Sequence, residues 1–188
     1  MADWRCGKIG PRGARLMKRL LALVPVLAFV ILAAYFAKAL ISDRDPNELP
    51  SALLDRPVPG FVLPGLAASD FAGKLVVVNF FASWCVPCRI EHPSMLRLSR
   101  NPQVMLYGIA YKDKDADSAK FLADLGNPYR KIGADSDGRA GIDFGVYGVP
   151  ETYVIDRAGR IRQRYVGPMT QQRLDQELLP LLARLSTP

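Results

Sequence analysis

The chain has 188 residues and a net charge of +7, with 49% hydrophobic and 23% charged residues. This composition excludes a disordered or low-complexity protein, and the length suits one domain of ordinary size with additional material. Three cysteines and one histidine exclude a dense disulfide scaffold and a set of several zinc sites. Residues 1–20 carry +5 of the net charge, so only +2 remains elsewhere and no basic face is left for nucleic acid.

A basic segment over residues 1–19 precedes a long apolar one. Residues 20–37 form an uncharged run of 18 residues, which at about 1.5 Å per residue spans most of a ~30 Å hydrocarbon core. We predict one transmembrane anchor over residues 20–41, with the basic segment and Cys6 in the cytoplasm. A cleaved signal peptide is the alternative, because Ala37-Lys38-Ala39 resembles a cleavage site. The length of the apolar run and the lysine in that triplet favour the anchor.

Both alternatives export the remainder of the chain, because positively charged residues stay on the cytoplasmic side. Residues 42–60 are rich in proline and charge and are typical of a linker, which leaves one domain over residues 61–188. In a bacterium this predicts a single-pass inner-membrane protein whose catalytic domain lies in the periplasm.

The first half of the exported domain alternates between strand and helix patterns. Residues 75–81 are almost all apolar, which predicts a strand buried on both faces of a sheet. The pattern then predicts a helix from about residue 85, a second buried strand over 104–111 and a helix over 117–125 that Asp117 caps. This order implies a parallel right-handed crossover.

The last third of the domain has a different pattern. Residues 152–156 and 160–166 resemble strands joined by the short turn 157–159, which predicts an antiparallel hairpin. An amphipathic helix follows over residues 170–185, and we expect Pro180 to kink it. A parallel half joined to an antiparallel hairpin predicts a mixed α/β sandwich.

Two cysteines separated by Val86-Pro87 stand where the first buried strand gives way to a helix. Cys85 then faces free backbone N–H groups and the positive end of the helix, which lower a thiol pKa from about 8.5. Pro87 in the first turn loses no hydrogen bond. We therefore predict a redox-active disulfide in which Cys85 is the exposed nucleophile and Cys88 the resolving thiol.

Two other interpretations of the cysteine pair remain. A zinc knuckle needs four ligands, and His92 is the only further soft ligand on this side of the anchor, so we predict no metal. A purely structural disulfide suits an exported domain, although a two-residue loop constrains the unfolded chain little. The position between strand and helix favours redox chemistry.

Several motifs carry a resemblance to known proteins. Trp84-Cys85-Val86-Pro87-Cys88 after a buried strand, with Pro93 and the downstream Val149-Pro150, resembles the thioredoxin fold. The CcmG/DsbE-type thiol:disulfide interchange proteins of cytochrome c maturation are similar over three further segments, which are Arg89 to Pro93, Tyr107 to Asp113 and Gly145 to Asp156. The resemblance covers roughly residues 49–188 and the anchor. It implies a thioredoxin-like α/β fold, with a central mixed sheet flanked by helices, after one N-terminal transmembrane helix.

The resemblance also implies a function. The protein is expected to be a periplasmic reductant that receives electrons from a membrane dithiol donor. It is expected to keep the heme-binding cysteines of apocytochrome c, or their maturation chaperone, reduced through the Cys85–Cys88 disulfide and without another cofactor. Alternatives are a general periplasmic dithiol oxidase or disulfide exchanger, and a non-catalytic adaptor that docks apocytochrome. The absence of histidine between the cysteines favours the reductant.

The same resemblance assigns roles around the disulfide. Trp84 and Pro87 belong to the cysteine motif, and Asn79 replaces the aspartate that typical thioredoxins bury, so it cannot accept a proton. Glu91 follows Cys88 by three residues on one helix face and is placed to handle the proton instead, unless it is an ordinary solvated residue.

Three consecutive residues far downstream complete the expected site. The resemblance implies that Pro150 is cis and faces the disulfide. Val149 is expected to offer backbone groups to an extended client peptide, as in strand addition. Glu151 is expected to place a carboxylate beside the substrate groove.

Overall fold

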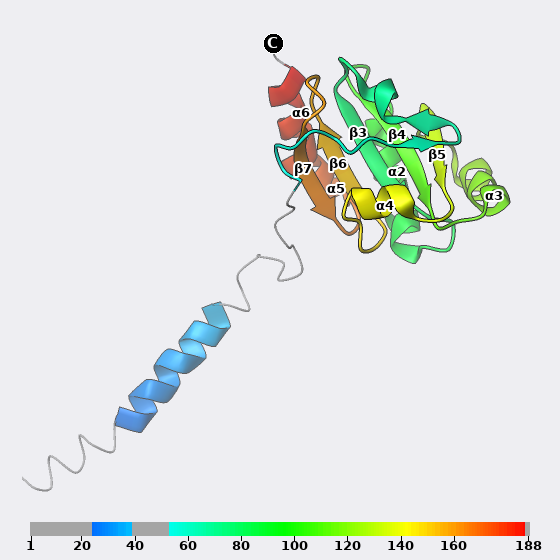
Figure 1. Ribbon diagram of the computed structural model, residues 1–188. Helices are drawn as coiled ribbons and strands as arrows, with labels where there is room; N and C mark the ends of the chain where they lie inside the picture. Colours follow the sequence, from blue (N-terminus) through cyan, green and yellow to red (C-terminus); the bar gives the residue numbers. More distant parts are fainter. Residues whose placement is uncertain (1–23, 39–52, 187–188) are drawn as a thin grey trace, which may run out of the picture. The chain divides into compact units, whose positions relative to one another are not determined.

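The computed structural model describes residues 24–38 and 53–186 (Figure 1). The chain divides into two units, Met1–Glu48 and Leu49–Pro188, and each is described by itself. In the first unit residues 24–38 are helical and exposed. No helix in the two described ranges is long and apolar enough to cross a bilayer. Several predictions fall wholly or partly outside the described residues, namely the basic segment 1–19, Cys6, the ends of the anchor 20–41 and most of the linker 42–60.

The second unit is built on a five-stranded sheet of order β5-β4-β3-β6-β7. The strands β3, β4 and β5 are parallel, whereas β6 and β7 are antiparallel to their neighbours. Their bounds are Val76–Phe81, Met105–Tyr111, Lys131–Asp135, Glu151–Ile155 and Ile161–Val166 for β3 to β7. The predicted thioredoxin-like mixed α/β fold is confirmed.

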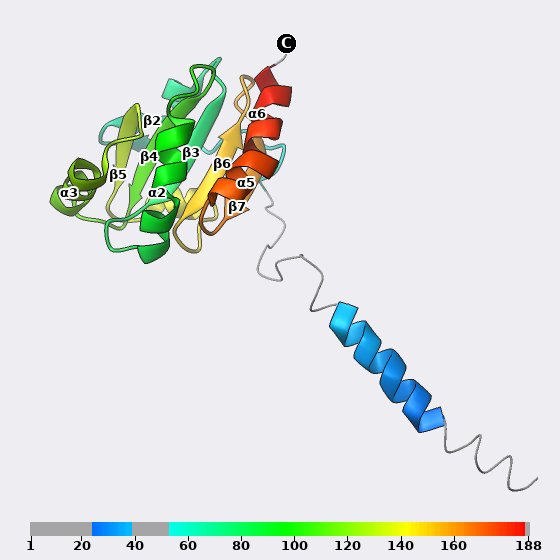
Figure 2. The same cartoon turned by 180° about the vertical axis from the view of Figure 1, so that it is seen from behind.

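Helices cover both faces of this sheet. The helix α2 (Val86–Leu98) and the C-terminal helix lie on one face (Figure 2), and the short α4 (Arg139–Asp143) lies on the other (Figure 1). The helix α3 (Asp115–Leu125) lies near the β5 edge (Figure 1). A small hairpin, β1 (Val62–Leu63) with β2 (Leu66–Ala67), and the 3-10 turn Ala68–Phe71 precede β3.

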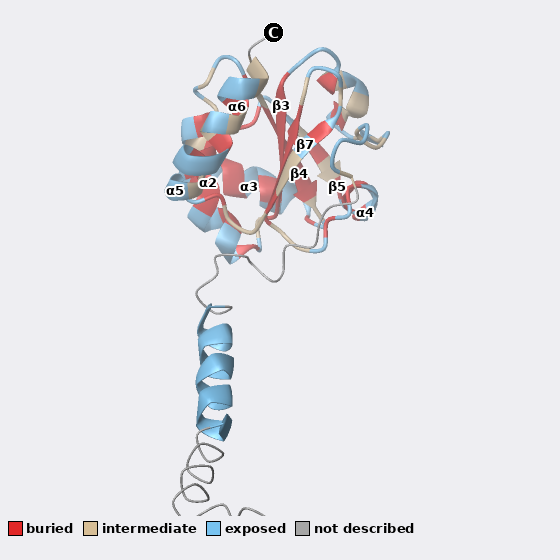
Figure 3. Cartoon of the chain, turned by 90° about the vertical axis from the view of Figure 1, so that its left-hand side faces the viewer, coloured by how far each residue is buried: buried red, intermediate tan, exposed pale blue. Residues whose placement is uncertain are grey.

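The strand β3 is buried along its whole length, as its composition predicts (Figure 3). Because side chains alternate along a strand, Val77 and Phe81 join the core under α2 while Val76, Val78 and Phe80 join the core on the opposite face. Asn79 therefore also points to the α2 face, where it is fully buried. A polar group is thus placed beneath the helix that carries the cysteines.

The predicted elements agree with the structure to within a few residues, with two differences in the helices. The helix α3 begins two residues earlier than expected because the backbone N–H groups of Asp117 and Ser118 already bond the Lys114 carbonyl, so Asp117 does not cap it. The C-terminal helix runs through Pro180 as α5 (Gln171–Arg173), a π-helical segment (Leu174–Leu178) and α6 (Leu179–Ser186). Proline cannot donate a helical hydrogen bond, and the wider π turn accommodates it.

A glycine in the central sheet makes room for an aromatic ring. Gly108 pairs with Asn79 across β3 and β4, and a Cβ at this position would lie 2.8 Å from ring carbons of Tyr129 and 2.9 Å from Phe81. The Tyr129 ring stacks on Phe81 with centroids 4.9 Å apart. The missing side chain of Gly108 thus allows Tyr129 to reach the centre of the sheet.

We expect Gly108→Ala to lower the free energy of unfolding by about 1–3 kcal/mol, because the added methyl group overpacks the Tyr129 ring. Gly60→Ala is the matched control, since a Cβ there meets nothing within 4 Å. Urea unfolding of the oxidised protein measures both. Equal stability of the two variants would contradict the packing described for Gly108.

Candidate active site

The cysteine pair lies at the junction of β3 and α2. Cys85 is the N-cap residue of α2, and its Sγ accepts a hydrogen bond from the Cys88 backbone N–H at 3.1 Å. The two residues form a disulfide with their Cα atoms 5.3 Å apart. Pro87 occupies the first turn of the helix, where its missing N–H leaves no carbonyl unpaired. The helix N-terminus is thus directed at Cys85, as the sequence indicates.

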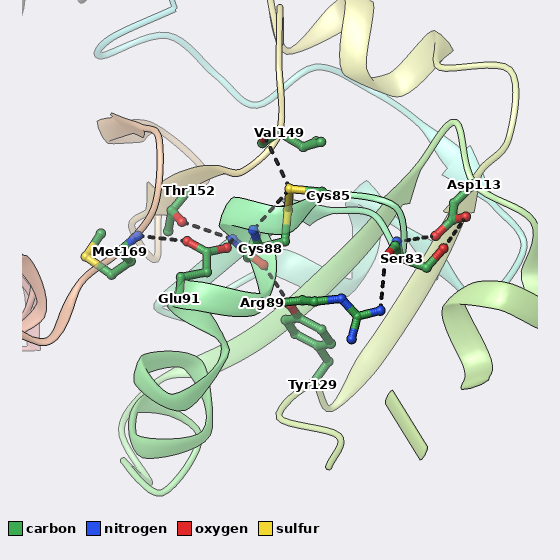
Figure 4. Close-up of a disulfide and its surroundings, with 11 residues drawn as sticks. Ser83, Cys85, Cys88, Arg89, Glu91, Asp113, Tyr129, Val149, Thr152 and Met169 are labelled. Atoms are coloured by element: carbon green, nitrogen blue, oxygen red, sulfur yellow. Dashed lines mark hydrogen bonds between the residues drawn. A yellow bond between two sulfur atoms is a disulfide. The ribbon is translucent and has the colours of Figure 1, made fainter. Parts of the chain in front are cut away.

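Both cysteines are nearly covered. Cys85 is 3% and Cys88 2% exposed, so the expected exposure of Cys85 is not observed in the oxidised protein. Its sulfur lies 3.5 Å from the carbonyl oxygen of Val149, which covers it (Figure 4). The neighbouring Trp84 and Val86 are 59% and 67% exposed. The two sulfurs are therefore distinguished by the helix N-terminus and not by exposure.

The loop before β6 carries the second half of the site. The Val149–Pro150 peptide bond is cis, as the resemblance implies. The Val149 carbonyl points toward the Cys85 sulfur (Figure 4). The loop thereby places a backbone hydrogen-bond acceptor beside the position from which a client cysteine would approach.

A buried polar network lies on the other side of the disulfide. Glu91 is 1% exposed, and its carboxylate accepts a hydrogen bond from the Met169 backbone N–H at 2.8 Å (Figure 4). It also accepts one from the Asn79 side-chain amide at 2.8 Å. Asn79 also donates to the Thr152 hydroxyl at 3.2 Å and accepts from the Tyr129 hydroxyl at 2.6 Å. Glu91 is therefore a buried residue, and the solvated alternative does not hold.

The environment of Glu91 changes its proton affinity. Burial is the largest influence and raises the pKa of this carboxyl to about 7. The hydrogen bonds from Met169 and Asn79 and the charge of Arg173 oppose it by lowering the pKa. Burial likewise raises the pKa of Tyr129 well above its ordinary value, so its hydroxyl remains a donor. A carboxyl with this pKa is protonated and ionised to similar extents at neutral pH. Glu91 is thus suited to take up or release a proton one helical turn from Cys88.

Glu151 is not placed as expected. Alternation along β6 directs it to the sheet face opposite α2, where it is fully buried. Its carboxylate accepts hydrogen bonds from Arg164 at 2.8 Å, the Tyr153 hydroxyl at 2.9 Å and the Tyr147 backbone N–H at 3.1 Å. Arg164 also donates to the Gly145 carbonyl. Glu151 therefore holds the loop before Pro150 in place instead of lining a groove.

Some residues of the site carried no signal that sequence reasoning used. Thr152 lies opposite Asn79 in the register of β6, which follows once the sheet order is known. Tyr129 and Met169 come from loops far along the chain, and only the fold brings them to Asn79 and Glu91.

The raised pKa of Glu91 leads to a specific pH dependence of stability. The carboxyl has an ordinary pKa of 4.5 and a folded-state pKa of about 7, so the folded protein binds more protons between these values. Protonated Glu91 therefore stabilises the folded state by about 3 kcal/mol below pH 4.5, and this contribution is lost as the pH rises through about 7. We expect Glu91→Gln to remove this decline from the free energy of unfolding of the oxidised protein.

Chemical unfolding across this pH range measures the effect. Asp124→Asn, a half-exposed carboxylate on α3 that pairs with Lys120, is the control and should keep the wild-type slope. Parallel pH curves for the wild type and Glu91→Gln would show that the buried carboxyl does not titrate as described.

Comparisons with known proteins agree with this geometry. The Redoxin family model matches residues 62–178. The chain is 43% identical over 176 residues to the thiol:disulfide interchange protein DsbE of Pseudomonas aeruginosa, covering 90% of this chain and 96% of that protein. It is 41% identical over 165 residues to the thiol:disulfide interchange protein HelX of Rhodobacter capsulatus, covering 84% and 92%.

A solved structure gives the same fold. The crystal structure of a Chlorobium tepidum protein described as a thiol:disulfide interchange protein DsbE is 29% identical, with a TM-score of 0.58, and covers 69% of this chain and 94% of that one. The described site holds the disulfide on the first turn of a helix, where the helix N-terminus lowers the pKa of a thiol. The chain therefore belongs to the Redoxin family and, within it, to the DsbE- and HelX-type thiol:disulfide interchange proteins, which are thiol–disulfide oxidoreductases.

Proposed function

We propose that the protein is a reductant of the heme-binding cysteines of apocytochrome c, or of their maturation chaperone. The observation that carries this proposal is the position of the disulfide between the Val149 carbonyl and the buried Glu91 network. The resemblance to the CcmG/DsbE-type proteins supports the choice of client. The reducing direction is supported by Val86-Pro87, since no histidine between the cysteines stabilises a thiolate.

The exchange reaction proceeds in two steps. In the reduced protein the Cys85 thiolate attacks one sulfur of a client disulfide, a Cys85–client bond forms, and the other client sulfur leaves as a thiolate. The Cys88 thiolate then attacks Cys85, which forms the Cys85–Cys88 disulfide and releases the second client sulfur. Two electrons pass to the client. Glu91 accepts the proton that Cys88 loses, because its pKa lies near neutrality.

The proposal includes a compartment and a donor. An anchor over residues 20–41 would hold the domain on the periplasmic side of a bacterial inner membrane, where disulfides form and must be reduced selectively. A membrane dithiol protein would return two electrons to the Cys85–Cys88 disulfide after each cycle. No metal or further cofactor takes part in either half of this cycle.

Trapping the mixed disulfide tests the proposed client. Cys88→Ser removes the resolving thiol and keeps the nucleophile, so the full-length variant should accumulate a covalent adduct through Cys85. We expect non-reducing electrophoresis with mass spectrometry to identify apocytochrome c or a maturation factor in this adduct.

Two matched variants control this experiment. Cys85→Ser should trap nothing, and Cys6→Ser in the Cys88→Ser background should leave the adduct unchanged. An adduct that forms through Cys88 would reverse the two roles. A broad sample of exported proteins in the adduct would replace the specific reductase with a general disulfide exchanger.

The anchor has its own test. We expect the mature full-length protein to sediment with inner membranes and to resist extraction at high salt, because an apolar helix holds it in the bilayer. A mature protein that begins at about Leu40 and is released freely from the periplasm would show that the N-terminal segment is cleaved.

A further inference from the structure

The segment that leads into the cysteine motif is held by one carboxylate. Asp113 lies two residues beyond β4 and is 8% exposed. Its two carboxylate oxygens accept hydrogen bonds from the Ser83 backbone N–H at 2.6 Å and the Ser83 hydroxyl at 2.8 Å (Figure 4). One of them also accepts from the Lys114 N–H at 2.9 Å. Both donors of Ser83 thus depend on this side chain.

The residue before Asp113 holds the next residue of the motif. The Lys112 carbonyl accepts a hydrogen bond from the Trp84 indole N–H at 3.2 Å. Lys112 has a φ of 47°, one of only two positive values among the non-glycine residues that the structure describes. This left-handed conformation costs on the order of 1 kcal/mol in a non-glycine residue. The loop after β4 thus adopts an unfavourable backbone conformation in which it holds both Ser83 and Trp84.

The held segment presents an aromatic surface beside the nucleophile. Trp84 is 59% exposed and directly precedes Cys85, so its indole lies at the surface that a client protein meets first. The hydrogen bonds of Asp113 go to Ser83 and Lys114, and its role toward the sulfurs is therefore indirect. A fixed aromatic side chain contributes to protein binding without the entropy loss of ordering it on contact.

We propose that Asp113 is a positioning residue for exchange with protein clients. It fixes Ser83, and through Ser83 the orientation of Trp84, so that a client docks with its disulfide aligned to Cys85. A small disulfide does not need this surface. Loss of the carboxylate should therefore slow exchange with an extended client more than exchange with a small one.

The test compares two oxidants of the reduced full-length protein. Asp113→Asn keeps the size of the side chain, but its amide nitrogen cannot accept a hydrogen bond from Ser83. We expect the rate constant to fall about tenfold with a cyclic Cys-x-x-Cys-His peptide disulfide and to stay within about twofold with oxidised glutathione. The choice of this peptide substrate rests on the proposed function. If the reduced wild-type protein did not react with the peptide disulfide, the proposed function would be refuted. The fluorescence readout would still test the role of Asp113.

Fluorescence gives an independent readout of Trp84. The chain has two tryptophans, Trp4 and Trp84, so a Trp4→Phe background leaves only the indole of interest. We expect Asp113→Asn to increase quenching of Trp84 by acrylamide and to lower its fluorescence anisotropy. Ser83→Ala removes the hydroxyl hydrogen bond from the other partner and should give a change of the same sign, which guards against a folding defect in the first variant.

Asp115→Asn is the matched control. This residue is exposed in the first turn of α3, and its substitution removes the same charge two residues away. It should change neither the rate ratio nor the fluorescence. Equal slowing with peptide and glutathione in Asp113→Asn, or unchanged Trp84 quenching, would overturn the positioning role.

Discussion

The amide of Asn79 must be hydrogen-bonded, because it lies fully buried in the central strand of the sheet. Its partners come from three separate parts of the fold, which are Glu91 on α2, Thr152 on β6 and Tyr129 before β5. Glu91 in turn binds the backbone just before the C-terminal helix through Met169. One buried polar residue thus ties the cysteine-bearing helix to the sheet and to the C-terminus.

This arrangement places opposing electrostatic influences on the two thiols. The N-terminus of α2 favours a thiolate at Cys85, whereas Glu91 disfavours negative charge near Cys88. A strong oxidant stabilises its reduced thiolate form, and a reductant does not. The buried carboxyl and the absence of histidine between the cysteines therefore act in the same direction. Both fit the reducing direction that we propose for the protein.

Much of this structure could be predicted from local sequence. The buried strand before Cys85, the helix after it, and the hairpin around residues 157–159 follow from hydrophobic periodicity and turn residues. The short elements β5 and α4 were missed because five residues give little periodic signal. The thioredoxin-like fold itself is predicted by the separated motifs and not by periodicity.

The site was predictable only where one element sets the spacing. Glu91 lies under α2 because it follows Cys88 by three residues on one helix, which the sequence contains. Glu151 was misplaced because the face of a strand on which a residue lies depends on register, and a one-residue difference reverses it. Tyr129 and Asp113 reach the site from loops, where the backbone path sets the position and no periodic pattern records it.

The reduction potential of the Cys85–Cys88 pair, measured at neutral pH against glutathione, tests the reducing character of the site most directly. A site with a buried carboxyl beside Cys88 and no histidine between the cysteines should have a potential below about −180 mV, the value typical of protein disulfide isomerase. A potential near about −120 mV, as in a strong oxidant of the DsbA kind, would contradict it.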